Sequence, residues 1–101
     1  IEWFYSPTDM VLVLDHLRKH PVANDVLPLL AIHRGLSVDD LRWNYVGFKG
    51  GMEPGVVNFG LLLRDRNDRW YALDIAWNRA DGDVDRALLV VFTQRLLRLI
   101  P

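Results

Sequence analysis

The chain has 101 residues, of which half are hydrophobic and a quarter charged, so it can form one domain with a modest core and is not intrinsically disordered. The formal net charge is −1, which argues against a nucleic-acid partner held through phosphate contacts. The chain has no cysteine, which excludes disulfides and thiol nucleophiles. No apolar run approaches the roughly 20 residues of a membrane span. The chain starts with Ile, without Met or a signal-peptide pattern, so we expect a longer parent protein.

The first predicted element is a helix over 7–20. Ser6 is a suitable N-cap, Pro7 suits the first helical position, and Asp9 complements the positive end of the helix dipole. Apolar residues then recur at helical spacing until Pro21, which ends the pattern.

A second helix is predicted over 24–34, with Gly35 as its C-terminal stop. This prediction requires Pro28 to lie in the first turn, where its missing N–H costs nothing. His33 would then provide a favourable charge near the C-terminus of the helix. Residues 37–41 are a predicted connector.

Three strands are predicted next, over 43–49, 56–63 and 70–77, because polar and apolar residues alternate with period two. In the first strand, one face would carry Trp43, Tyr45, Gly47 and Lys49. A glycine-rich corner over 50–55 and a polar hairpin loop over 64–69 separate the strands.

The last predicted element is a helix over 84–100. The segment Asp81-Gly82-Asp83 offers a cap, and Arg95 and Arg98 lie near the C-terminal end, where cations are favourable. The complete order predicts an α+β fold, an antiparallel three-strand meander with flanking helices.

Lys49 is the first candidate functional residue. Five of the seven glycines lie between Gly47 and Gly60, around this lysine, and glycine lets a backbone approach a ligand. Two interpretations remain open: an anion or proton-transfer site, or a tight turn beside a solvated lysine. The phosphate-loop patterns Gly-x-x-x-x-Gly-Lys-Ser/Thr and Gly-x-Gly-x-x-Gly are absent, and no cofactor is indicated.

The chain contains no complete motif for a metal site or for a serine nucleophile. His16 and His20 would share a helix face, but a zinc site needs a third ligand, so we expect a surface role and no metal. Neither Ser6 nor Ser37 begins a Ser-x-x-Lys motif. The chain therefore carries no serine nucleophile in a recognisable motif.

Lys49-Gly50-Gly51, followed by two strands and a helix, resembles the third motif, Lys-Thr/Ser-Gly, of class A β-lactamases and related D-Ala-D-Ala peptidases. The segments 45–57 and 70–78 are similar to class A-like serine hydrolases of bacteria, and 6–10 resembles the helix start that precedes this region there. The resemblance spans residues 6–100. It implies a β-lactamase/transpeptidase-like fold, of which 1–101 is a C-terminal segment.

The resemblance also implies roles for individual residues. Lys49 would be catalytic, and the backbone N–H of Met52 would be one of two oxyanion-hole donors. Gly50, Gly51 and Glu53 would line the substrate site. Gly50 replaces the hydroxyl that binds a substrate carboxylate, and Met52 and Glu53 would crowd and acidify the rim. The expected substrate is therefore a small amide or ester other than a β-lactam.

By the same resemblance, the partner is the N-terminal remainder of the hydrolase domain, which would supply the serine, and the location is the bacterial cell envelope or periplasm, or outside the cell. A non-catalytic binding or envelope module is the alternative. A Ser-x-x-Lys motif upstream in the parent protein would distinguish the two. In the family fold, strand 70–77 pairs with a strand from near the N-terminus. The isolated chain should therefore self-associate through its unpaired edge.

Overall fold

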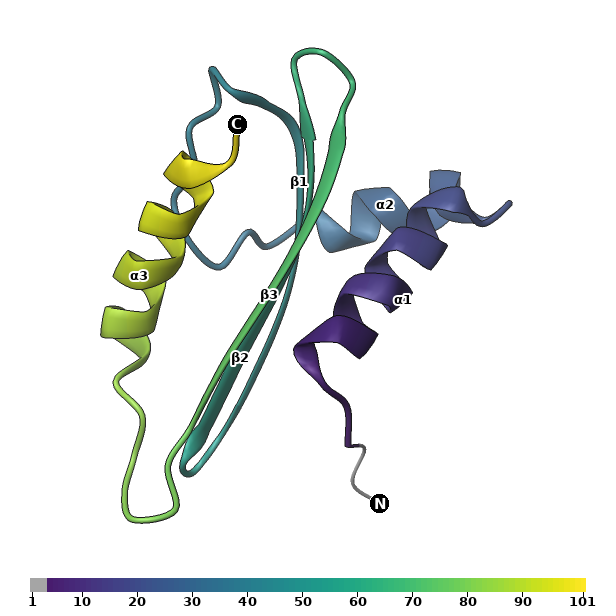
Figure 1. Cartoon of the computed structure of the whole chain (residues 1–101). Coiled ribbons are helices and arrows are strands. Elements are labelled where there is room, and N and C mark those ends of the chain that lie inside the picture. Colours follow the sequence, from purple (N-terminus) through teal and green to yellow (C-terminus); the bar gives the residue numbers. More distant parts are fainter. Residues whose placement is uncertain (1–3) are drawn as a thin grey trace.

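A computed structural model describes residues 4–101. The fold is α+β, with helices α1 (Pro7–Lys19), α2 (Ala23–Leu30) and α3 (Arg86–Leu99) and strands β1 (Trp43–Glu53), β2 (Val56–Asp65) and β3 (Trp70–Asn78). The strands form one antiparallel sheet in the order β1-β2-β3, which confirms the predicted meander. Helices α1 and α2 cover one face of the sheet and α3 covers the other (Figure 1). Residues 1–3, whose sequence led us to expect a longer parent protein, lie outside the described residues.

Helix α1 begins as its sequence predicts. The Ser6 hydroxyl accepts a hydrogen bond from the Asp9 N–H at 3.1 Å, and the Asp9 carboxylate accepts one from the Ser6 N–H at 2.8 Å. This capping box satisfies two donors that the first turn cannot pair internally. The helix ends at Lys19, one residue before the predicted end at 20.

Helix α2 is shorter than the predicted helix over 24–34. It ends at Leu30, and Pro28 lies inside it rather than in its first turn. Proline has no N–H to donate and crowds the preceding turn, which weakens this short helix. The helix ends two residues later, where the N–H groups of Ala31 and Ile32 bond to carbonyls three residues back. His33 and Gly35 consequently lie in the connector to β1, not at a helix end.

Strand β1 continues four residues past its predicted end, to Glu53. The predicted glycine-rich corner is wrong, because Gly50 and Gly51 pair in regular register with β2. The turn consists of Pro54 and Gly55 alone. Gly55 has φ +79°, which a type II turn requires at its third residue and which glycine adopts without strain.

A bulge near the start of β1 changes which side chains share a face. Trp43 and Tyr45 pair with consecutive residues of β2, so Asn44 is an extra residue in the strand. Trp43 therefore packs on the α3 side together with Val46, whereas the simple alternation placed it with Tyr45.

Helix α3 begins later than the predicted position 84. Its N-cap is Asp85, whose carboxylate accepts a hydrogen bond from the Leu88 N–H at 3.0 Å, rather than Asp81 or Asp83. The core lies between this helix and the sheet, and consists of Trp43, Val46, Val57, Phe59, Leu61, Leu63, Leu89 and Leu97. None of the helices between residues 4 and 101 is long and apolar enough to cross a bilayer.

Candidate functional site

The candidate residues lie on the last half of β1, where the two faces of the strand carry different side chains. Lys49, Gly51 and Glu53 belong to the α1 side, and Gly50 and Met52 belong to the α3 side, because successive residues alternate. The pairing is regular from Val46 to the turn. Lys49, Gly51 and Glu53 are exposed, and the Met52 side chain is 68% exposed.

The pairing pattern aims the Met52 N–H away from β2. The hairpin closes on the Glu53–Val56 pair across the two-residue turn. The two residues of this pair must be hydrogen-bonded to each other. In the alternative antiparallel pattern they would not be bonded, and the next residue, Pro54, would have to donate an N–H that it lacks. Bonded and non-bonded pairs alternate, so the next pair, Met52–Val57, is not bonded. The Met52 N–H therefore points out from the edge of the sheet.

The Lys49 ammonium lies at the same edge. Its Nζ donates a hydrogen bond to the Gly50 carbonyl at 2.5 Å. Gly50 belongs to another non-bonded pair, so this carbonyl faces outward, as the Met52 N–H does. β1 is an edge strand of the described sheet, with β2 as its neighbour. A cation and an outward backbone donor thus share the free edge of β1.

A packed aromatic ring explains why position 50 is glycine. A Cβ atom at Gly50 would lie 2.9 Å from Cε1 of Phe48, closer than side chains approach one another. The Phe48 ring is held from two other sides, by the backbone of Gly35 and by the Phe59 ring at 5.6 Å. A Cβ at Gly51, by contrast, meets no atom within 4 Å. The space that a Ser or Thr side chain would need at position 50 is therefore occupied.

A polar cluster on the α1 side was missed by the sequence analysis. The Asn58 amide donates to the Asp74 carboxylate at 2.9 Å, and the Tyr5 hydroxyl donates to Asn58 Oδ1 at 3.3 Å. Burial raises the pKa of the Asp74 carboxyl above its ordinary value, and the hydrogen bond from Asn58 offsets part of that effect. Asp74 and Lys49 lie on opposite sides of Gly60 in one cross-strand row. One signal in the sequence could have indicated this cluster, because Asp74 is the single acidic residue in the otherwise apolar strand 70–77.

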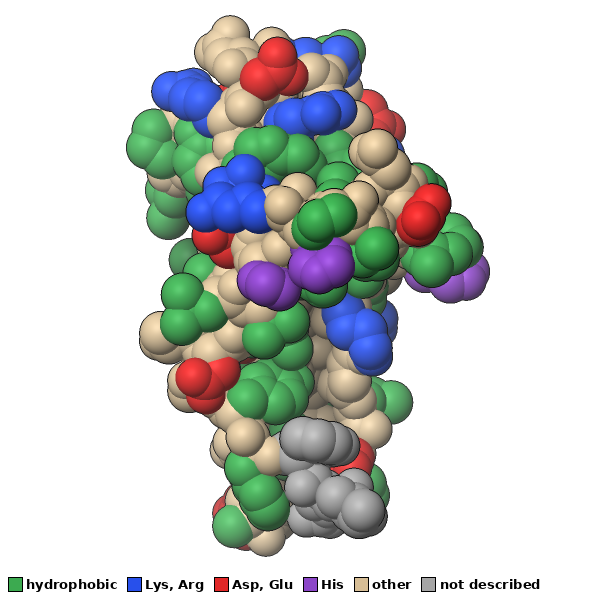
Figure 2. Space-filling view, turned by 90° about the vertical axis from the view of Figure 1, so that its right-hand side faces the viewer, with side chains coloured by type: hydrophobic (Ala, Val, Ile, Leu, Met, Phe, Trp, Pro, Cys, Tyr) green, Lys and Arg blue, Asp and Glu red, His purple; other side chains and the backbone are tan. Residues whose placement is uncertain are grey.

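The other residues considered for chemistry are not brought to this edge. The hydroxyl of Ser6 is engaged in the α1 cap, and Ser37 lies in the connector against α3, where its carbonyl accepts from Gln94. The rings of His16 and His20 are 5.5 Å apart at the C-terminal end of α1. Figure 2 shows neighbouring His side chains exposed on this side of the molecule. Within residues 4–101, no three His, Cys, Asp or Glu side chains are grouped closely enough to hold a metal ion.

Chemically, the free edge of β1 is suited to stabilising negative charge. An ammonium group attracts an anion, and an unpaired N–H held by the sheet can donate to an oxyanion without reorganising. Comparison of the sequence with protein-family models and with curated proteins found no match.

Proposed function

We propose that this chain is the C-terminal segment of a class A β-lactamase-like serine hydrolase, which acts on a small amide or ester through an acyl-enzyme. The observation that supports this most is the free edge of β1, where the Lys49 ammonium and the outward N–H of Met52 lie together. Groups of this kind accelerate acyl transfer, because the carbonyl oxygen becomes negatively charged as the nucleophile attacks.

In this proposal, the nucleophilic serine belongs to the N-terminal remainder of the same domain. Lys49 attracts the substrate and assists proton transfer at that serine. The Met52 N–H is one donor to the oxyanion, and the serine's own N–H is the other. Gly50, Gly51 and Glu53 line the substrate site, and the carboxylate of Glu53 disfavours anionic substrates there. On the basis of the resemblance, we further propose that the parent protein is located in the bacterial cell envelope or periplasm, or outside the cell.

A non-catalytic module with the same fold is the second candidate. The packing of Phe48 against Gly50 favours it, because that packing leaves no room for the hydroxyl-bearing residue of the family motif. The two candidates differ in whether the parent protein carries a nucleophile that Lys49 can serve.

Covalent labelling tests the proposal. The 101-residue chain should not react with a fluorophosphonate probe, whereas the complete parent protein should, because acylation requires an activated nucleophile. A complete protein that stays unlabelled by fluorophosphonate and penicillin probes supports the non-catalytic module. Labelling of the isolated chain overturns the proposal, since Ser6 or Ser37 would then be the nucleophile.

Lys49 is tested by substitution in the complete protein. Lys49→Ala should slow labelling by about 100-fold or more, which is the usual cost of removing one group that stabilises charge at the reacting centre. Lys49→Arg should restore only part of the rate, because a planar guanidinium does not reproduce a compact ammonium.

Lys19 provides the matched control, since it is the other lysine of the chain and pairs with Asp15 on α1. Lys19→Ala should label at the wild-type rate. A wild-type rate for Lys49→Ala removes Lys49 from the site.

A further inference from the structure

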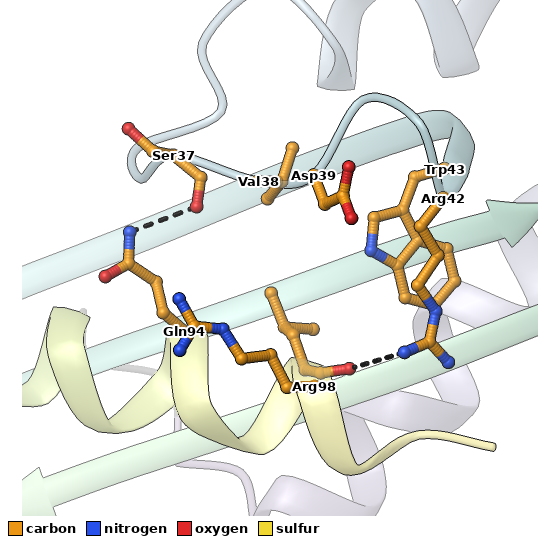
Figure 3. Close-up of a pocket in the computed structure, with 8 residues that line it drawn as sticks. Ser37, Val38, Asp39, Arg42, Trp43, Gln94 and Arg98 are labelled. Atoms are coloured by element: carbon orange, nitrogen blue, oxygen red, sulfur yellow. Dashed lines mark hydrogen bonds between the residues drawn. The ribbon is translucent and has the colours of Figure 1, made fainter.

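A cavity of about 520 Å³ lies on the α3 side of the sheet, apart from the Lys49 edge. The connector before β1 forms one wall and the C-terminal half of α3 forms the other (Figure 3). Its lining includes Val38, Asp39, Trp43, Gln94, Leu97 and Arg98. The volume falls within the range of small-molecule pockets. The lining combines apolar surface from Val38, Trp43 and Leu97 with polar and charged side chains.

Trp43 places an unpaired donor in this cavity. The residue as a whole is only 4% exposed. Its indole N–H makes no hydrogen bond with residues 4–101, and it is not one of their buried unpartnered atoms. The ring is fixed by an edge-on contact with Tyr71 at 5.8 Å and by the Arg42 guanidinium at 4.7 Å. Figure 3 shows the indole nitrogen on the side of the ring that faces the cavity. Although the ring is buried, this nitrogen is not among the buried side-chain atoms of the described chain that lack a partner, so it is open to the cavity and available to a ligand.

The two arginines of the lining differ in what they bind. Arg42 donates to the carbonyls of Leu97 and Pro101, at 3.4 and 3.0 Å, and to that of Ile100, so its guanidinium is used to cap α3. Arg98 makes no ion pair or hydrogen bond with the described part of the chain, and its guanidinium lies along the helical wall in Figure 3. Arg98 is therefore the cation available to a bound anion.

Asp39 limits the charge of that anion. One of its carboxylate oxygens accepts from the Leu41 N–H at 2.9 Å, which fixes the carboxylate on the connector wall. A second negative charge on a ligand would be repelled from that wall. The ligand should then carry one charge, directed toward α3.

We propose that this cavity binds a small monocarboxylic acid with an apolar body and an amide carbonyl, such as an N-acylated amino acid. The carboxylate pairs with Arg98, the carbonyl accepts from the Trp43 indole, and the apolar body lies on Val38 and Leu97. Bonds to a guanidinium are charge-assisted and directional, and the indole fixes the other end of the ligand.

Titration of the 101-residue chain with N-acetyl-L-phenylalanine tests this inference, with the Trp43 indole N–H signal in the NMR spectrum as the readout. We expect a saturable shift of that signal. N-acetyl-L-phenylalaninamide, which lacks the charge, should bind at least about tenfold more weakly, as loss of a charge-assisted hydrogen bond implies.

Arg98→Ala should weaken binding by a similar factor. Arg95→Ala is the matched control, because Arg95 is an exposed arginine of α3 outside the cavity lining, and it should bind as the wild type does. Val38→Phe fills the cavity without changing its charge and should abolish binding. If Val38→Phe does not fold, the difference in ligand affinity between Arg98→Ala and Arg95→Ala tests the inference instead.

Absence of a saturable Trp43 shift overturns the inference, and so does equal binding by Arg98→Ala and the wild type. Equal binding of the acid and its amide also overturns it. None of these outcomes bears on the Lys49 proposal, which concerns the free edge at the other end of β1.

Discussion

Gly50 and Gly51 look equivalent in the sequence, but they differ in how much space a side chain would have. Gly50 and Gly51 are neighbours in β1, and both have ordinary extended pairing. Gly50 faces the α3 side, where the Phe48 ring fills the space, whereas Gly51 faces open solvent. Of these two glycines, only Gly50 is therefore required by packing.

Substitution of these glycines by alanine should give different results. Gly50→Ala forces the Phe48 ring to move and should lower the free energy of unfolding by about 1–3 kcal/mol, the usual cost of overpacking. Gly51→Ala should leave stability unchanged or raise it by up to about 1 kcal/mol, since glycine is unfavourable in a strand. Urea unfolding of both variants measures this, and equal losses would contradict the packing explanation.

Among the connections between elements, the β2–β3 hairpin depends on one carboxylate. The buried Asp65 accepts hydrogen bonds from the N–H groups of Asn67 and Arg69 at 2.8 and 2.9 Å, and from Arg69 Nε at 2.9 Å. Burial opposes ionisation of Asp65, but the hydrogen bonds from Arg69 and Asn67 outweigh it and lower the pKa of the carboxyl. The ionised side chain thus holds the loop in place.

The hairpin should therefore lose stability in acid. A lowered pKa means that the stabilisation is complete above the ordinary value of 3.8 and is lost as the pH falls through the lower, folded-state pKa. Asp65→Asn should be less stable than the wild type at pH 7, and the difference should shrink in strong acid. Asp68→Asn is the control, because Asp68 is exposed in the same loop with φ +61°, which asparagine tolerates. A pH-independent difference for Asp65→Asn would exclude the ionised form as the cause.

At the scale of the whole molecule, the surface is larger than that of a compact monomer. The accessible area is 6947 Å², against the roughly 5,900 Å² expected for a folded chain of this mass. Strand β3 is an edge strand of the described sheet, with β2 as its neighbour. The outer side of α3 also exposes a row of apolar residues, Leu88, Val91, Phe92 and Leu99. Exposed edges and apolar rows of this kind favour association.

We expect the isolated chain to self-associate in solution. Sedimentation should give an apparent mass that rises with concentration. Ala76→Lys places a charge on the exposed edge of β3 and should reduce this association, as edge lysines do in natural sheets. Ala80→Lys adds the same charge beyond the strand and should have less effect. A stable monomer at high concentration would contradict this account of the β3 edge.

The candidate site was predictable in part. Lys49 and its glycines stand out in the sequence, but the predicted strand end after Lys49 was wrong. The direction of the Met52 N–H follows from the register of the hairpin, which the Pro54-Gly55 turn fixes. The polar cluster at Asp74 was not predicted, because its hydrogen bond from Asn58 joins two different strands.

The sequence by itself determined the type and order of the elements and the start of α1, because capping and side-chain periodicity depend on residues a few positions apart. Only the tertiary structure decided how far β1 extends, since pairing with β2 holds Gly50 and Gly51 extended although glycine weakens a strand. It also decided the cavity at Trp43, whose walls lie more than 50 residues apart in the chain. Long-range packing creates such features, and no local pattern in the sequence encodes them.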